Sequence, residues 1–253
     1  MTLDGAALVT GGAAGLGEAI AHRLAHDGAA VAVADVDQPG AERVAASITN
    51  GGGRATAVPC DVTRTADVEA AVRAATALGP LRTLVLSAAV ESRQSVLECS
   101  DEDWQRVLDI DLKGPFLCMR AAIPVIAATG GGSVIAMGST LGLIVAPGHP
   151  AYCAAKGALV NLCKQAAIEH AGDGVRVNVV APSATDTGLF IRFSEMAPDP
   201  EGMRSRIAEL NPMHRLGTAR EVCDAVAFLA SDASTYTSGC VLPIDGALAA
   251  RRM

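Results

Sequence analysis

Apolar runs of strand length alternate along this chain with longer stretches that have helical spacing. Nearly every position of the runs is apolar, which is typical of parallel strands buried on both faces. The expected strands are 6–12, 29–37, 55–62, 81–90, 133–138, 175–182 and 240–245. The expected helices are 17–28, 39–49, 65–78, 100–128, 151–171 and 219–231. Because strand and helix alternate throughout, we predict a single α/β domain over 1–253, with helices on both faces of a doubly wound parallel sheet.

Residues 183–215 interrupt this pattern. They have no clean period, and a long irregular excursion from a compact domain often forms a lid over a binding site. The segment holds two of the four Phe residues and three of the seven Met residues: Phe190, Phe193, Met196, Met203 and Met213. We therefore expect a substrate lid around 183–215. Its apolar side chains either contact an apolar or mixed substrate or merely pack the segment onto the body.

Composition narrows the classes of partner. With 50% hydrophobic residues, the 253-residue chain can bury a full core, whereas its formal net charge of -7 argues against nucleic acid or an anionic membrane as a partner. No apolar run is long enough to span a membrane, and the first residues lack the features of a signal peptide. Seven Cys residues without a C-x-x-C motif, and five His residues without a close cluster, predict a cytoplasmic chain with no metal site.

A glycine-rich turn follows the first expected strand. Gly11, Gly15 and Gly17 have the spacing G-x-x-x-G-x-G, and the helical stretch begins at the last of them. In a strand–turn–helix of this kind, main-chain N–H groups and the helix dipole can face a phosphate, and glycines let the ligand approach closely. The spacing differs from the G-x-G-x-x-G dinucleotide fingerprint, so a tight turn without a ligand is the alternative.

Acidic residues end the next two strands. Asp35 lies eighteen residues after Gly17, where a carboxylate can accept hydrogen bonds from both ribose hydroxyls of an adenosine. A 2'-phosphate would be repelled there, and the neighbouring residues supply no cation, so NAD is favoured over NADP. Asp61 ends the third strand, where it could bind an adenine amino group or cap a helix.

Three residues between 138 and 159 make sense together as chemistry. Ser139 ends a strand, where open α/β sheets place their ligands. If Pro150 lies in the first turn of a helix, Tyr152 and Lys156 share one face as an i, i+4 pair. An ammonium beside a phenol lowers the phenol's pKa from its ordinary value near ~10, towards the range of efficient proton transfer. The alternative is an ordinary surface pair.

Taken together, these motifs resemble the short-chain dehydrogenase/reductase family over nearly the whole chain. The segments that carry the resemblance are TGGAAGLG at 10–17, Asp35, CDV at 60–62, Ser139, Tyr152 with Lys156, APSATDT at 181–187, RLGTAREV at 215–222 and SGCVLPIDG at 238–246. The family likeness implies a Rossmann-type sheet of about seven strands, and a hydride passed between a nicotinamide ring and a carbinol or carbonyl carbon.

The resemblance also implies roles for individual residues. Tyr152 would be the general acid/base, Lys156 would hold the nicotinamide ribose and lower the phenol's pKa, and Ser139 would hydrogen-bond the reacting oxygen. Thr187 would contact the carboxamide. The positions expected to contact the cofactor are Gly11, Ala14, Gly15, Leu16, Gly17, Asp35, Val36, Asp61, Val62, Ser87, Ala88, Ala89, Tyr152, Lys156, Pro182, Ser183, Thr185 and Thr187. A homotetramer built on helices 100–128 and 151–171 is implied as well.

Three departures from the family pattern stand out. The sequence at 86–89 is Leu-Ser-Ala-Ala where the family usually has Asn-Asn-Ala-Gly, and Ser183 replaces a usual Gly. Asp111 stands where the family typically carries Asn, whose main-chain carbonyl supports a water relay to the lysine. An ionised carboxylate would oppose Lys156 and raise the tyrosine's pKa. We therefore place Asp111 among the catalytic residues, with the hypothesis that it stays partly protonated or shifts the activity optimum to higher pH.

The function expected from these features is NAD-dependent interconversion of a secondary alcohol and a ketone, with Tyr152 as general acid/base. An NADPH-dependent oxoacyl or ketone reductase is an alternative that Asp35 disfavours. A non-catalytic nucleotide-sensing protein on the same fold is the other alternative, prompted by the departures at 86–89 and Asp111.

Overall fold

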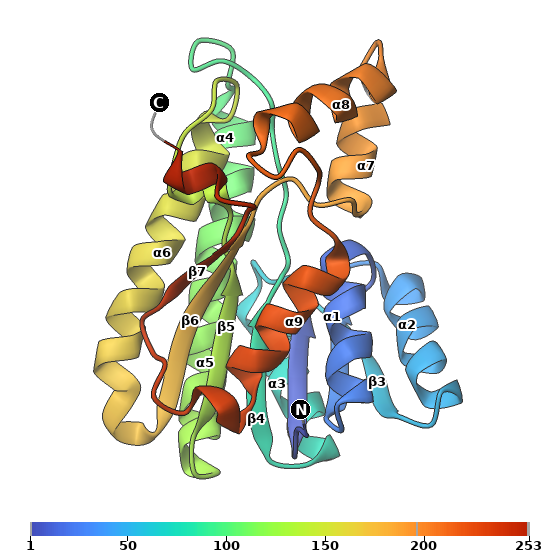
Figure 1. Ribbon diagram of the computed structural model, residues 1–253. Coiled ribbons are helices and arrows are strands. Elements are labelled where there is room, and N and C mark those ends of the chain that lie inside the picture. Colours follow the sequence, from blue (N-terminus) through green and yellow to red (C-terminus); the bar gives the residue numbers. More distant parts are fainter. Residues whose placement is uncertain (1, 196, 252–253) are drawn as a thin grey trace.

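The computed structural model describes residues 2–195 and 197–251, apart from the side chains of 189, 192 and 193. Within these residues, seven parallel strands form one sheet in the order β3-β2-β1-β4-β5-β6-β7. The strands are β1 (Ala6–Thr10), β2 (Ala30–Asp35), β3 (Arg54–Pro59), β4 (Leu81–Leu86), β5 (Gly132–Met137), β6 (Val175–Pro182) and β7 (Val241–Ile244). The order runs outward in both directions from β1 and β4, which confirms the doubly wound α/β fold (Figure 1).

Helices cover both faces of the sheet. One face is packed by α1 (Gly15–His26), α2 (Gln38–Asn50) and α9 (Ala219–Ala230), of which α1 and α9 lie in front of the strands in Figure 1. The other face is packed by α3 (Thr65–Leu78), α5 (Gly114–Ala128) and α6 (Pro150–His170). Helix α4 (Asp101–Leu108) precedes α5 and packs against α6.

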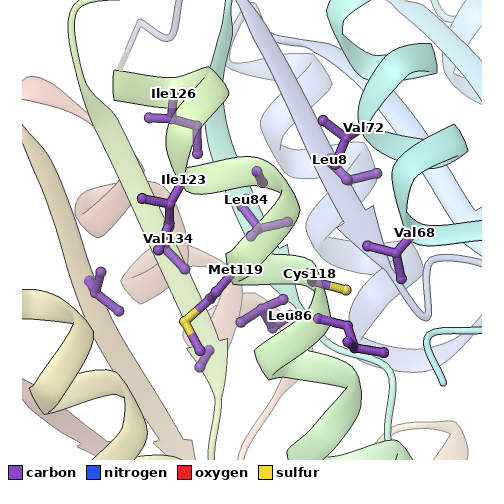
Figure 2. Packing of buried hydrophobic residues seen from close by; sticks show 14 of the residues in the cluster. Leu8, Val68, Val72, Leu84, Leu86, Cys118, Met119, Ile123, Ile126 and Val134 are labelled. Atoms are coloured by element: carbon purple, nitrogen blue, oxygen red, sulfur yellow. The ribbon is translucent and has the colours of Figure 1, made fainter. Parts of the chain in front are cut away.

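Most strand positions are apolar because each side of the sheet is a core, with exceptions such as Arg82 and Asn178. Neighbouring residues point to opposite faces, so Leu8 packs with α3 and α5 while Val9 packs with α1 and α9. Figure 2 shows the first of these cores, in which Ile123 of α5 lies beside Val134 of β5 and Leu84 of β4 belongs to the same cluster. Leu84 is fully buried, and truncating such a residue to Ala costs about 2–5 kcal/mol of folding free energy.

The long helix expected over 100–128 is interrupted. Residues Asp109–Lys113 form a π-helical segment between α4 and α5. Pro115 follows it and has no N–H to donate to the carbonyl of Asp111, four residues earlier. The N–H of Gly114 instead bonds the carbonyl of Asp109, five residues earlier. Such π segments are frequent at functional sites, and this one carries Asp111, whose side chain is fully buried.

The expectation of an irregular segment at 183–215 is wrong. The segment contains two helices, α7 (Gly188–Glu195) and α8 (Pro200–Leu210), which lie beyond the C-terminal ends of the strands (Figure 1). Helices this short have too few turns for a helical spacing of apolar residues to be recognised in the sequence. The start of α8 did carry a signal, because Asp199 caps it by accepting from the N–H of Gly202 and Pro200 opens its first turn.

The two helices are tied to the body at both ends. Arg204 on α8 pairs with Asp186 at 2.6 Å, and the buried Asn211 donates to the carbonyl of Asp245 at 2.8 Å. In the part of the chain that the structure describes, none of the helices is long and apolar enough to cross a membrane.

Candidate active site

A cavity of about 720 Å³ opens at the C-terminal ends of the strands, beside the point where the strand order reverses. In open α/β sheets this is the usual ligand position. The cavity collects the predicted cofactor positions, which had been read from six separate stretches of sequence. Its walls include Gly11, Ala14, Gly15, Leu16, Gly17, Asp35, Val36, Asp61, Val62, Ser87, Ala88, Ala89, Ser139, Tyr152, Lys156, Pro182, Ser183, Thr185 and Thr187. Among the predicted site residues, Asp111 is the one that does not line the cavity. Its buried side chain contacts Nζ of Lys156 instead.

The glycine-rich turn has the geometry of a phosphate cradle. Gly15 has φ +60°, begins α1, and would point a Cβ into open space, with no described atom nearer than 3.7 Å. Gly17 is required for a different reason, since a Cβ there would collide with the main-chain carbonyl of Gly11. The turn therefore brings the positive end of α1 to the cavity without side-chain obstruction.

Asp35 presents a fixed carboxylate to this cavity. One oxygen accepts the N–H of Ala13 and the other accepts the N–H of Asp37, each at 3.0 Å. Arg43 lies nearby and donates to the carbonyl of Ala13 at 2.8 Å, but its guanidinium is also held by both carboxylate oxygens of Glu18. The edge of the cavity at Asp35 therefore carries a fixed carboxylate, but the expectation that no cation lies nearby missed Arg43, which comes from α2.

Asp61 does not cap a helix. Its Oδ1 accepts the N–H and the hydroxyl of Thr63, at 2.9 and 2.8 Å, and the first residue of α3 is preceded by Arg64 as the N-cap. The carboxylate stands at the cavity wall. Of its two sequence-based interpretations, contact with an adenine amino group is the one compatible with this position, and it stays a prediction.

The fourth strand ends earlier than expected, at Leu86 rather than at 90. The N–H of Ser87 bonds the hydroxyl of Thr10 at 3.2 Å, and the N–H of Val90 bonds Oδ1 of Asp111 at 2.8 Å. Side chains thus replace a neighbouring strand as hydrogen-bond partners. All four residues of the loop 87–90 line the cavity.

Ser139, Tyr152 and Lys156 come together at the inner end of the cavity. Ser139 follows β5, its Oγ accepts the N–H of Leu141 at 3.1 Å, and its hydroxyl is hydrogen-bonded to the Tyr152 phenol. Pro150 opens α6, so Tyr152 lies in its first turn and Lys156 one turn further on. Lys156 Nζ lies 5.4 Å from the centre of the Tyr152 ring, and both side chains are buried. They are not a surface pair.

Known proteins resemble this chain along its whole length. Residues 11–248 match a family model described as enoyl-(acyl carrier protein) reductase. The chain is 38% identical over 244 residues to 2-(S)-hydroxypropyl-CoM dehydrogenase 3 of Xanthobacter autotrophicus, covering 96% of this chain and 95% of that one. It is 37% identical over 240 residues to meso-2,3-butanediol dehydrogenase of Serratia marcescens, covering 94% and 92%. The crystal structure of a short-chain type dehydrogenase/reductase from Mycobacterium marinum matches with a TM-score of 0.91 at 32% identity, covering 98% and 96%.

The chain belongs to the short-chain dehydrogenase/reductase family. As a member of this family it is an oxidoreductase that acts on CH–OH groups of alcohols with a nicotinamide cofactor. The cavity fits such a cofactor, since it joins a side-chain-free helix N-terminus to a carboxylate at the far strand end and to the Tyr152 hydroxyl. Among the described residues, no group of three or more His, Cys, Asp or Glu side chains is arranged to hold a metal ion.

In this dehydrogenase/reductase the ammonium group of Lys156 is already paired with a carboxylate. Its Nζ lies 3.0 Å from Oδ2 of Asp111 and donates to the carbonyl of Met137 at 3.1 Å. Burial raises the pKa of Asp111, although the neighbouring Lys156 opposes that rise. Burial also disfavours the ammonium, but Asp111 and Tyr152 outweigh it and raise the pKa of Lys156.

Lys156 lowers the pKa of the Tyr152 phenol as expected, but the net shift of that pKa is upward. Burial raises the pKa of Tyr152 above its ordinary value, and Lys156 offsets only part of this rise. The carboxylates of Asp111 and Glu91 raise the pKa further, while the hydrogen bond from Ser139 lowers it. The sequence predicted the ammonium correctly. It also predicted the opposing carboxylate of Asp111, but it could not show that the phenol is surrounded by low-dielectric protein.

Several residues on the substrate side of the cavity were missed. The charged or ionisable ones are Glu91, Arg93 and His149, and apolar walls come from α8 through Ile207 and Leu210. His149 directly precedes Pro150 and α6, a position that would have marked it for attention. Of the apolar residues expected in the lid, Phe190 lines the cavity, whereas Met203 and Met213 do not. Met196 and the side chain of Phe193 lie outside the described residues.

Proposed function

We propose that the chain is an NAD-dependent dehydrogenase that interconverts a secondary alcohol and a ketone, with Tyr152 as general acid/base. The observation that carries the proposal is one cavity lined by the glycine turn, by Asp35, and by Ser139, Tyr152 and Lys156. Both relatives described above are named as dehydrogenases of hydroxyl-bearing compounds. When bound, NAD supplies the hydride acceptor for the alcohol carbon.

The proton would be handled at the phenol oxygen of Tyr152. In the oxidising direction the phenolate takes the proton of the substrate hydroxyl, and in the reducing direction the phenol returns it to the ketone oxygen. The hydroxyl of Ser139 is hydrogen-bonded to that phenol, so it is placed to bind the same substrate oxygen. Lys156 holds positive charge beside the ring and opposes the effects of burial and of Asp111 on the phenolate.

Selection of NAD over NADP would come from Asp35. Its two oxygens are fixed by main-chain N–H groups and still face the cavity, so they can accept the two ribose hydroxyls. A 2'-phosphate would meet this carboxylate at close range. The neighbouring guanidinium of Arg43 is held by Glu18 rather than left for a phosphate. This arrangement disfavours the NADPH-dependent reductase.

The remaining sequence-based expectations enter the proposal at the same level. Residues 183–215 would act as the substrate lid, because α7 and α8 contribute Phe190, Ile207 and Leu210 to the cavity. The enzyme would be a homotetramer. All seven cysteines are described and none is in a disulfide, which suits the reducing cytoplasm that we expect for it.

The test is turnover of a panel of secondary alcohols, followed by the absorbance of the reduced nicotinamide. We expect activity with NAD⁺, and we expect Tyr152→Phe to lower kcat/KM by roughly 10²–10⁴-fold while NADH still binds. Wild-type protein that binds NADH but oxidises none of the alcohols would instead support the nucleotide-sensing alternative. Unchanged turnover in Tyr152→Phe would remove Tyr152 from its proposed role.

A further inference from the structure

A histidine and a glutamate that the proposed mechanism does not use face the substrate side of the cavity. His149 is the N-cap residue of α6 and is only 6% exposed, and Glu91 lies on the loop after β4. The Nδ1 of His149 lies 2.7 Å from Oε1 of Glu91. This is a short charge-pair contact, although the geometry at Nδ1 is not that of a hydrogen bond. Both residues line the cavity that Tyr152 lines.

The two loops that carry this pair are fastened together. The N–H of Gln94 donates to the carbonyl of Gly148 at 3.1 Å, which joins the loop of Glu91 to the loop of His149. On the other side, the N–H of Cys153 donates to the carbonyl of His149 at 2.9 Å as part of the first turn of α6. His149 and Tyr152 thus belong to the same helical turn, three residues apart, and their relative positions are fixed by the backbone.

The carboxylate of Glu91 determines what His149 can offer. The carboxylate beside Nδ1 favours the tautomer that carries its proton on Nδ1, and that tautomer keeps its lone pair on Nε2. Nδ1 is buried and has no hydrogen-bond partner among the described residues, and no described group pairs with Nε2, so Nε2 is the atom left for the cavity. The surrounding walls at Leu141 and Phe190 are apolar. An acceptor in such surroundings favours a ligand that donates a hydrogen bond.

We propose that His149, oriented by Glu91, binds a second hydroxyl group of the substrate, so that the enzyme prefers diols to simple secondary alcohols. The inference rests on the proposed function in that Tyr152 would act on one hydroxyl while His149 holds the other. An anionic group at the same place is disfavoured, because the carboxylate of Glu91 lines the same wall. The guanidinium of Arg93 offsets the negative charge of Glu91 only in part. Its Nε lies 3.9 Å from the same Oε1 that contacts His149, which is a long distance for an ion pair.

Matched pairs of substrates test the proposal. Butan-2-ol is compared with butane-2,3-diol, and cyclohexanol with its 1,2- and 1,4-diols, while 3-hydroxybutanoate serves as the anionic probe. We expect kcat/KM to be on the order of tenfold or more higher for at least one diol than for its monohydroxy counterpart. In His149→Phe that ratio should fall to about one, with the monohydroxy value changed by less than about threefold, because phenylalanine keeps the ring but not the acceptor.

Two further variants distinguish the loss of a hydroxyl contact from misfolding of the protein. Glu91→Gln keeps the side-chain volume, but its amide can pair with either tautomer of His149, so the preference for diols should fall without a loss of NADH binding. His170→Phe is the matched control. His170 is at the other end of α6 and pairs with Asp173 at 3.0 Å, away from the cavity, so the preference should be unchanged.

Binding supplies a readout that does not need turnover. In the presence of NAD⁺, the diol should raise the unfolding midpoint more than its monohydroxy counterpart does, and His149→Phe should remove the difference. A His149-dependent difference without oxidation of any alcohol would contradict the proposed function and support the second-hydroxyl site. The inference is overturned if neither readout depends on His149, or if 3-hydroxybutanoate is preferred to every diol.

Discussion

Lys156 and Asp111 form a buried ion pair with 3.0 Å between Nζ and Oδ2, one helical turn from the phenol of Tyr152. The lysine side chain is 3% exposed and the aspartate is not exposed at all. Because the carboxylate neutralises part of the field that the ammonium exerts on the phenol, Asp111 acts on the proton chemistry through Lys156 without lining the cavity. We therefore regard Asp111 as a positioning residue.

Replacing Asp111 by asparagine should move the pH–rate profile to lower pH. Asp111 raises the pKa of Tyr152, so its removal lowers that pKa, and the phenolate needed for alcohol oxidation forms at lower pH. We expect the rising limb of kcat/KM against pH to shift by roughly one unit. Asp109→Asn is the control, because Asp109 belongs to the same π-helical segment and pairs with the exposed Lys113 at 3.3 Å. Superimposable profiles of the parent and Asp111→Asn would remove the hypothesis.

Replacing Asp35 by alanine should weaken the preference for NAD⁺. The variant loses both acceptors for the ribose hydroxyls and also the repulsion of a 2'-phosphate. We expect the ratio of kcat/KM for NAD⁺ to that for NADP⁺ to fall by about 10- to 100-fold, the loss of one or two charge-assisted hydrogen bonds. Asp37→Ala is a suitable control. The side chain of Asp37 caps α2 by accepting the N–H of Gly40, whereas the predicted ribose contact is made by Asp35. An unchanged ratio in Asp35→Ala would contradict the proposed selection.

Glu221 should contribute to stability in a way that depends on pH. Hydrogen bonds from Arg215 and Thr218 lower the pKa of Glu221 from 4.5 to about 2. A lowered folded-state pKa means that the stabilisation is complete above the unfolded pKa near 4.5 and is lost as the pH falls towards 2. Glu221 and Thr218 form a capping box at the start of α9. Glu221→Ala removes it and should lower the unfolding free energy by about 1 kcal/mol at neutral pH. The difference in unfolding free energy between the parent protein and Glu221→Ala should become smaller below pH 4.5. A difference that stays constant with pH would contradict this prediction.

The enzyme should be a tetramer in solution. Large apolar side chains are exposed on the helices expected to pair between subunits, with Trp104, Phe116 and Ile168 exposed by 40%, 44% and 83%. Light scattering after size exclusion should give about four times the mass of one chain. Ile168→Glu should lower the mass, whereas Leu97→Glu, on a loop, should not. A monomeric parent protein would contradict the expectation.

The sequence was most informative where one physical cause dominates. Burial on both faces makes most positions of a strand apolar, and β6 lies at 175–182, where its largely apolar run predicted it. The run after β4 misled because it stays apolar beyond Leu86, while its N–H groups leave the ladder for Thr10 and Asp111. Composition does not show which partner a main-chain donor takes.

The site was predicted as far as its residues lie next to recognisable spacing. Tyr152 and Lys156 reveal each other because they are one helical turn apart. Glu91 and His149 do not, because they are brought together by loops from different strands. The direction in which Asp111 changes the Tyr152 pKa was predicted, whereas the larger effect of burial was not, because burial depends on the packing of the whole fold.

The hydrogen bonds from Ala13 and Asp37 to Asp35 have a consequence for cofactor exchange. A carboxylate that is free to rotate loses side-chain entropy each time a ribose binds to it. The rotamer of Asp35 is fixed by the fold itself, so that loss occurs once, during folding, and is not repeated at each binding event. The wall at which we propose that the adenosine binds is thus preorganised, and a dinucleotide would enter or leave without a change in the rotamer of Asp35.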